Sequence, residues 1–266
     1  MRKDYIESAG SPADETAFVE EYWTKVWEKI TDRAKRTDEI GNTEEYRIMA
    51  PYLARLPPRS RILDGGCGLG EFVVYLNGKN FETIGVDLSR KTVALLNQKF
   101  PTAQFVSGDI RKLEFENASF DAYFSWGVFE HFEEGPGPCI AEAFRILKPG
   151  GYLFITVPFD NLRQGLRGAR ERAAQTTAGM RFYQWRFTKA ELARELTLRG
   201  FTVEKLQPIS KSEGVLRALH HDLGLPFEWK LTRGLRKVLT PVVPASLAAH
   251  MLMAVVRKPA APIIAV

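Results

Sequence analysis

Cysteine and histidine are scarce in this sequence. The 266 residues include two cysteines, Cys67 and Cys139, and four histidines. Two cysteines are too few for a disulfide framework or for a four-cysteine zinc site. The basic residues at the N-terminus are not followed by an apolar stretch, so we expect no secretory signal. The resulting expectation is a reducing, cytoplasmic location.

Long apolar runs are scarce too. Residues 238–256 form an uncharged run close to membrane-spanning length, but this run contains Pro241, Pro244, Ser246 and His250. We interpret it as a loop, a short helix and a final strand. The composition is that of a globular protein, with 45% apolar and 26% charged residues.

Acidic residues become rare in the second part of the chain. Residues 1–160 carry 19 basic and 25 acidic side chains, whereas residues 161–266 carry 18 basic and 7 acidic ones. We therefore expect the C-terminal part to bind an anionic partner, which would be a substrate, a lipid headgroup or nucleic acid. The alternative is a solvated basic face without a partner.

The chain divides into a helical beginning and a longer region of alternating strands and helices. Residues 1–60 predict a helical cap, because apolar residues recur at spacings of three and four after Asp14 and a second helix is expected over 43–56. From residue 61 onwards, seven short apolar segments alternate with helical ones. These expected strands are 61–64, 81–87, 103–108, 120–125, 152–157, 201–206 and 250–256.

Such alternation implies crossover connections, and therefore a parallel sheet covered on both faces. We predict an α/β fold with a doubly wound sheet in residues 61–266. Two irregular insertions, at about 160–187 and 207–249, are expected to interrupt it. Between them, Thr188 and Glu191 form a capping box that starts a helix over 188–199.

A glycine-rich loop follows the first expected strand. Asp64, Gly66, Gly68 and Gly70 form a D-x-G-x-G-x-G pattern directly between a strand and a helix. Glycines let the backbone turn sharply and let a ligand approach it closely. The Lys and Ser/Thr of a phosphate-binding P-loop are absent, and Glu71 replaces the last glycine of the dinucleotide pattern.

Two acidic residues follow at the ends of the next two strands. Asp87, 23 residues after Asp64, is placed to accept both hydroxyl groups of a ribose. Asp109 follows the third strand and can accept from an exocyclic amino group, with Leu88 and Ile110 as apolar walls. Each acid alone could equally be a turn or cap residue. Their order at successive strand ends favours a nucleoside-binding site.

These features together resemble the class I S-adenosylmethionine-dependent methyltransferases, of the broad group that includes quinone-biosynthesis and small-molecule enzymes. The segments that carry the resemblance are LDGGCGLG (63–70), IGVDLS (84–89), GDI (108–110), FDAYFSWGVFEHF (120–132) and FRILKPGGYLFITVP (144–158). The resemblance implies a seven-stranded Rossmann-like sheet, whose last strand is antiparallel to the others, with S-adenosylmethionine as cofactor.

The resemblance also implies roles for single residues. Asp64, Gly66, Gly68 and Gly70 would form the loop that holds the methionine part of the cofactor, and Asp87 would hold the ribose. Leu88, Asp109 and Ile110 would hold the adenine. Ser125 and Trp126 would place a backbone carbonyl near the methionine amino group.

The sequence offers one candidate general base, His131, on the loop after the fourth strand. The alternative is that His131 only packs or caps this loop. Some quinone methyltransferases of the family hold a divalent ion with Glu-x-x-Glu-His. Here Glu130 precedes His131, but Gly127 stands in place of the first Glu, so we expect no metal.

Two basic segments indicate which kinds of partner the protein binds. Arg181, Phe182, Tyr183, Trp185 and Arg186 combine cations with aromatic rings, which suits an anionic or conjugated small molecule. A helix over 229–239 would have apolar and basic sides, and is expected either to lie on an anionic membrane at the inner face or to pack on the sheet.

The leading hypothesis is a methyltransferase that acts on an oxygen or nitrogen atom of a small or lipid-linked molecule. An RNA methyltransferase is the first alternative, motivated by the basic C-terminal part. No recognisable RNA-binding module supports it, so nucleic acid is not the expected partner. A non-catalytic, cofactor-binding regulatory protein is the second alternative. The sequence leaves the oligomeric state open.

Overall fold

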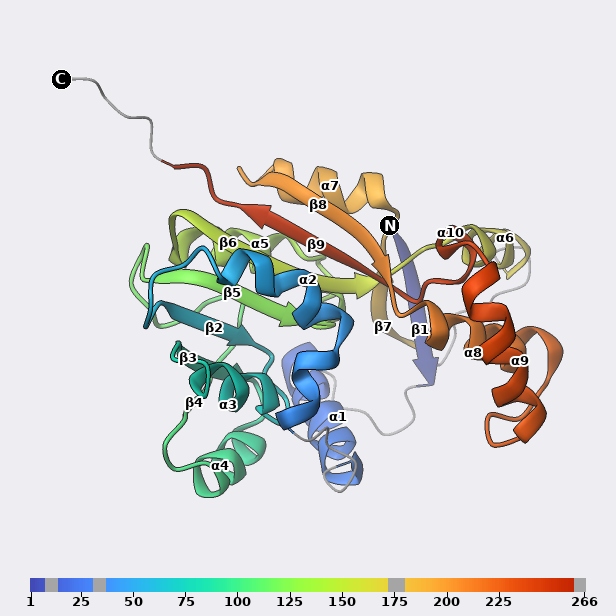
Figure 1. The fold of residues 1–266 in the computed structure, drawn as a ribbon, viewed down its shortest axis with the longest axis horizontal. Coiled ribbons are helices and arrows are strands. Elements are labelled where there is room, and N and C mark those ends of the chain that lie inside the picture. Colours follow the sequence, from blue (N-terminus) through green and yellow to red (C-terminus); the bar gives the residue numbers. More distant parts are fainter. Residues whose placement is uncertain (8–13, 31–36, 172–179, 261–266) are drawn as a thin grey trace.

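The computed structural model describes residues 1–7, 14–30, 37–171 and 180–260. A seven-stranded sheet, ordered β4-β3-β2-β5-β6-β9-β8, forms its centre (Figure 1). Its strands are β2 (Arg61–Gly65), β3 (Glu82–Asp87), β4 (Gln104–Ser107), β5 (Phe120–Trp126), β6 (Leu147–Pro158), β8 (Thr202–Ile209) and β9 (Met251–Arg257).

Neighbouring strands run parallel, except that β9 is antiparallel to both β6 and β8. The predicted α/β fold with an antiparallel last strand is confirmed.

Helices cover both faces of this sheet. Side chains alternate along a strand, so Leu63 and Tyr123 join a core with two helices on one face, while Ile62 and Phe124 join a core with two helices on the other. The first pair of helices is α5 (Gly137–Ile146) and α7 (Lys189–Thr197), and the second is α2 (Glu44–Leu53) and α3 (Glu71–Asn77). A third cluster joins α3 to α4 (Arg90–Lys99) around Phe105.

The N-terminal region is not purely helical, and this prediction was wrong in part. A strand, β1 (Arg2–Glu7), pairs antiparallel with β7 (Met180–Arg186) in a separate two-stranded sheet. Strand β7 lies far from β1 in the sequence, so no pattern within either segment predicts that the two strands pair. As predicted, a helix follows Asp14: this is α1 (Glu15–Ile30), and Asp14 Oδ1 accepts the N–H of Ala17 at 2.8 Å.

The described parts of the two insertions are more regular than predicted, although the helix expected over 229–239 is present. The first contains α6 (Leu162–Glu171) and β7, while its residues 172–179 lie outside the described residues. The second contains α8 (Lys211–Leu223), α9 (Lys230–Val242) and α10 (Ala245–Ala248). Glycines and Pro241 weakened the helical pattern in the sequence. Gly214 is required, because a Cβ there would lie 1.5 Å from the carbonyl oxygen of Ala248.

Among the described residues, no helix combines the length and the apolar character needed to cross a membrane. The uncharged run 238–256 instead comprises the end of α9, the short α10 and most of β9.

The strand order reverses beside β2, since β3 lies on one side of it and β5 on the other. Ligands of doubly wound sheets bind at the carboxyl ends of the strands at such a switch point. The loops after β2, β3, β4 and β5 meet there. They carry the glycine-rich segment, Asp87, Asp109 and His131.

Candidate active site

The loop after β2 turns on glycines that leave its backbone accessible. Gly66 and Gly68 have φ angles of +79° and +51°, in the region that favours glycine. A Cβ on Gly66 would lie 2.4 Å from Cγ2 of Val128, and one on Gly68 would lie 2.7 Å from Cζ2 of Trp27. Any larger residue would therefore displace the walls of the site.

Asp87 ends β3 beside this loop and points towards it. Its side chain is buried. Oδ2 accepts the N–H of Gly68 and Oδ1 the N–H of Ser89, both at 2.9 Å. Burial raises the pKa of the Asp87 carboxyl, while the N–H groups of Ser89 and Gly68 oppose that rise. Each carboxylate oxygen keeps a lone pair for a further donor, such as a sugar hydroxyl.

A cavity of about 390 Å³ lies over the glycine loop and Asp87. Its volume is in the range of small-molecule sites, which is about 300–1,000 Å³. The predicted residues that line it are Asp64, Gly66, Gly68, Asp87, Leu88, Asp109, Ile110, Trp126 and His131.

Two of the predicted cofactor residues are not among those that line the cavity. Gly70 is the N-cap of α3, and a Cβ there would lie 2.6 Å from Phe105, so its role is structural. Ser125 is fully buried, and its hydroxyl donates to the carbonyl oxygen of Gly65 at 2.5 Å. Asp64, also buried, does line the cavity. Burial and the charge of Asp87 raise the pKa of the Asp64 carboxyl well above its usual value.

Helix α1, from the N-terminal region of the chain, forms one wall of the cavity. Val19, Glu20, Trp23 and Trp27 contribute to its lining. The rings of Trp23 and Trp27 stack with their centroids 5.4 Å apart. The hydroxyl of Thr24 lies 2.7 Å from that of Ser89, which fastens the helix beside Asp87. The apolar side predicted for this helix therefore forms a wall of the cavity.

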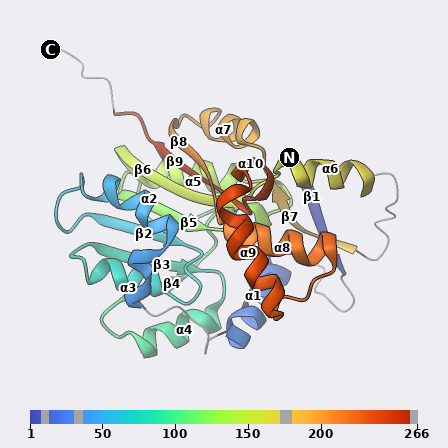
Figure 2. The same cartoon turned by 45° about the vertical axis from the view of Figure 1, so that its right-hand side comes forward.

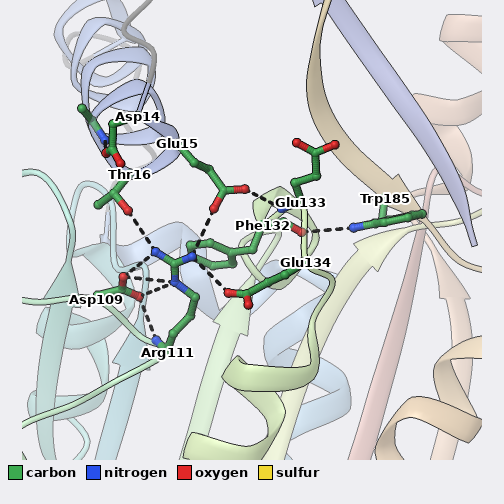
Figure 3. A network of polar contacts seen from close by, with 10 residues as sticks. Asp14, Glu15, Thr16, Asp109, Arg111, Phe132, Glu133, Glu134 and Trp185 are labelled. Carbon is green, nitrogen blue, oxygen red and sulfur yellow. Dashed lines mark hydrogen bonds and ion pairs between the residues drawn. The ribbon is translucent and has the colours of Figure 1, made fainter.

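Arg111 ties the start of α1 to two loops of the sheet (Figure 3). Its Nη1 donates to Glu15 at 3.1 Å and to Glu134 at 3.2 Å, and its Nη2 donates to Thr16 at 3.0 Å. Its guanidinium also lies 4.3 Å from the ring centroid of Phe132. The beginning of α1 is thus held by one cation that follows β4.

The same arginine occupies the carboxylate of Asp109. Arg111 Nη2 lies 2.7 Å from Oδ2 of Asp109, and its backbone N–H donates to Oδ1 at 2.9 Å. An adenine amino group, the predicted partner of Asp109, would have to share these oxygens. Arg111 was not predicted as a site residue. Its position two residues after Asp109 indicates the contact with that acid, but nothing local indicates its contacts with α1.

His131 lies at the edge of the cavity with one ring nitrogen already bound. Nδ1 is 2.8 Å from the carbonyl oxygen of Tyr183. A carbonyl only accepts, so the hydrogen is on Nδ1 and Nε2 keeps its lone pair. Burial lowers the pKa of His131 to about 4, so the ring is neutral at neutral pH. The rings of Trp23 and Tyr183 each lie 5.1 Å from the imidazole.

Glu130 is buried but is not among the residues that line the cavity. Its Oε2 has no hydrogen-bond partner among the described residues, and burial raises its pKa to about 8. His131 thus lines the cavity, whereas the neighbouring Glu130 is buried outside it. The part of the chain that the structure describes contains no cluster of three or more His, Cys, Asp or Glu side chains that could hold a metal ion.

The residues present fit an adenosyl group attached to an amino acid. A buried carboxylate suits two ribose hydroxyls, and Leu88 and Ile110 provide apolar walls for a base. The glycine loop brings its backbone to the cavity, and Val128 and Trp27 leave no room for a side chain at Gly66 or Gly68.

Comparison with known proteins agrees with this geometry. Residues 63–155 match a family model described as a methyltransferase domain. The malonyl-[acyl-carrier protein] O-methyltransferase of Enterobacter lignolyticus is 32% identical over 137 residues, which are 49% of this chain and 54% of that protein. The demethylmenaquinone methyltransferase of Deinococcus radiodurans is 29% identical over 169 residues, which are 60% and 68% of the two chains. The chain spans about half the length of several of the curated relatives it matches.

A solved structure extends the likeness to nearly the whole chain. The 1,6-didemethyltoxoflavin-N1-methyltransferase of Burkholderia thailandensis, with 1,6-didemethyltoxoflavin and S-adenosylhomocysteine bound, aligns with a TM-score of 0.57 at 19% identity. The alignment covers 97% of this chain and 96% of that one. The chain therefore contains a methyltransferase domain over residues 63–155, and its fold is that of the class I S-adenosylmethionine-dependent methyltransferases.

Proposed function

We propose that this protein transfers a methyl group from S-adenosylmethionine to an oxygen or nitrogen atom of a small or lipid-linked molecule. The observation that carries the proposal is the position of Asp87, buried beside the glycine loop at the switch point and facing a cavity that α1 covers.

The residues of the cavity divide into two groups. Asp64, Gly66, Gly68 and Asp87 would hold the amino acid and ribose parts of the cofactor. Leu88, Asp109 and Ile110 would flank the base, with Arg111 orienting the carboxylate of Asp109. Trp126 lines the cavity at the end of β5.

The bound cofactor supplies a methyl group that its sulfonium already makes electrophilic, so the protein has mainly to orient the acceptor. His131 is the residue best placed to do so, because its neutral Nε2 can accept a hydrogen bond from an acceptor O–H or N–H. Trp23 and Phe132 would provide apolar surface around that acceptor. A wall built by α1 suits a small molecule or a single chain better than a folded RNA.

The cofactor site is tested by calorimetry with S-adenosylhomocysteine. We expect binding at one site, and its loss in Asp87→Ala. Glu82→Ala, an exposed acid at the opposite end of the same strand, is the matched control and should bind normally. Absence of binding by the wild-type protein would contradict the proposal.

The acceptor is tested with labelled S-adenosylmethionine and a cell extract, followed by separation of lipid, small-molecule and RNA fractions. Label in the lipid or small-molecule fraction supports the proposal. Label in RNA supports the RNA methyltransferase instead. Cofactor binding without transfer to any fraction supports a regulatory protein.

A further inference from the structure

Exposed apolar side chains gather at one end of the molecule. Nine of the twelve large apolar side chains exposed in the described part of the chain lie in residues 162–171 and 211–248. They belong to α6, α8, α9, α10 and the connections between them. These helices contact one another and lie together near the β1–β7 pair (Figures 1 and 2). A cluster of exposed apolar side chains marks an interaction site.

The outer side of α9 carries the longest part of this surface. Leu231, Val238 and Val242 are 59%, 67% and 71% exposed, and Trp229, directly before the helix, is 53% exposed. The three helical residues are spaced by seven and four, so they share one side of α9. We call these four residues the outer apolar stripe.

The stripe is not the side by which α9 packs on the protein. Leu235 and Leu239 point inwards and join the core formed with Val215 and Leu219 of α8. The helix predicted over 229–239 was expected to have a single apolar side. In the structure, its apolar residues instead divide into an inner pair, Leu235 and Leu239, which packs on α8, and an outer pair, Leu231 and Val238, which has no such contact in the described residues.

Basic residues flank the outer apolar stripe. Lys230, Arg233 and Lys237 are exposed, and Arg236 is half-buried. The helix contains no acidic residue. Its surface therefore combines apolar side chains, one tryptophan and several cations, which is the composition of helices that lie in the headgroup region of anionic bilayers.

We infer that the outer apolar stripe of α9, with Lys230, Arg233 and Lys237, is a docking surface for an anionic lipid bilayer. The inference goes beyond the proposed function and does not depend on it. Charge complementarity selects this occupant. A second copy meeting the same face would place cations against cations. A nucleic acid would match the cations but leave Leu231, Val238 and Val242 against phosphates.

Vesicle flotation of the full chain without cofactor tests the inference. We expect the protein to float with vesicles of phosphatidylcholine and phosphatidylglycerol, to float little with phosphatidylcholine alone, and to be released by added salt. The double variant Leu231→Ser/Val238→Ser and the variant Lys237→Glu should each bind the anionic vesicles about tenfold more weakly.

Two variants on α7 serve as matched controls. Leu198→Ser removes a leucine that is 66% exposed at the end of that helix, and Lys189→Glu reverses an exposed lysine at its start. Both should float as the wild type does. Circular dichroism and the melting temperature show whether every variant is folded, since all the changed side chains are exposed.

Three results would overturn the inference. The first is failure of the wild-type protein to float with anionic vesicles at low salt, or flotation of the double variant at the wild-type level. The second is a dimer in light scattering that the double variant abolishes, which would make the stripe a subunit interface. The third is RNA binding that Lys237→Glu weakens and the double variant leaves intact.

Discussion

Arg111 binds Asp109 through both carboxylate oxygens. Its Nε lies 3.1 Å from Oδ1 and 3.1 Å from Oδ2, and its Nη2 lies 2.7 Å from Oδ2. The same guanidinium binds Glu15 and Thr16 in the first turn of α1. The acid expected to face the adenine and the first turn of the helix that covers the cavity therefore bind the same cation (Figure 3).

Replacing Arg111 by alanine should loosen α1. The change removes charge-assisted hydrogen bonds to Glu15 and Asp109, and the ring contact with Phe132. We expect faster amide hydrogen exchange in residues 15–30, and S-adenosylhomocysteine binding weakened about tenfold, because the covering wall is less ordered.

Arg145→Ala is the matched control for this effect. Like Arg111, Arg145 binds an acid, which here is Glu142. It also donates to the backbone carbonyl groups of Leu113 and Phe115, and none of these residues lines the cavity. It should lower the melting temperature and leave exchange in α1 unchanged. Equal exchange of α1 in the two variants would show that Arg111 does not fasten the helix.

Gly68→Ala should disturb the cavity in addition to destabilising the backbone of the loop. The left-handed conformation costs an alanine about 1–2 kcal/mol, and the new Cβ would press on Trp27 at 2.7 Å. Gly224→Ala carries a similar backbone cost at φ +68°, with no atom within 4 Å of its Cβ. We expect both to lower the free energy of unfolding, and Gly68→Ala alone to lose cofactor binding and shift tryptophan fluorescence.

The sheet and the loops that line the cavity could be predicted because their signals are local. Strands buried on both faces appear as short apolar runs, and the turn after β2 needs glycines whose spacing is visible in the sequence. The position of Asp87 follows from the end of the strand that carries it. These features require no knowledge of distant parts of the chain.

The parts that could not be predicted depend on distant partners. Tyr5 pairs with Phe182 in β1 and β7, so neither segment shows its strand character alone. Helix α9 lies where a helix was expected, but which of its apolar residues face inwards depends on its packing against α8. Arg111 was missed because its partners in α1 are about 95 positions away.

His131 should affect transfer more than cofactor binding. In His131→Ala we expect kcat to fall about 100-fold or more, with S-adenosylhomocysteine affinity almost unchanged. His131→Gln keeps an acceptor near the position of Nε2 and should recover part of the rate. Because burial lowers the pKa of His131 to about 4, kcat/KM should show no break near pH 6.5 from this group. Loss of cofactor binding in both variants would instead indicate a packing role.

Glu130 should make the protein less stable as pH rises. Burial raises the pKa of this carboxyl from 4.5 to about 8, so the folded state holds a proton that the unfolded state releases. The stabilising contribution is complete below pH 4.5 and is lost as pH rises through about 8. Urea unfolding from pH 5 to 8.5 should show the wild type losing stability relative to Glu130→Gln by up to about 1.4 kcal/mol per pH unit. Glu133→Gln, at an exposed neighbour, should run parallel to the wild type. Parallel curves for Glu130→Gln as well would mean that Glu130 is ionised in the folded protein.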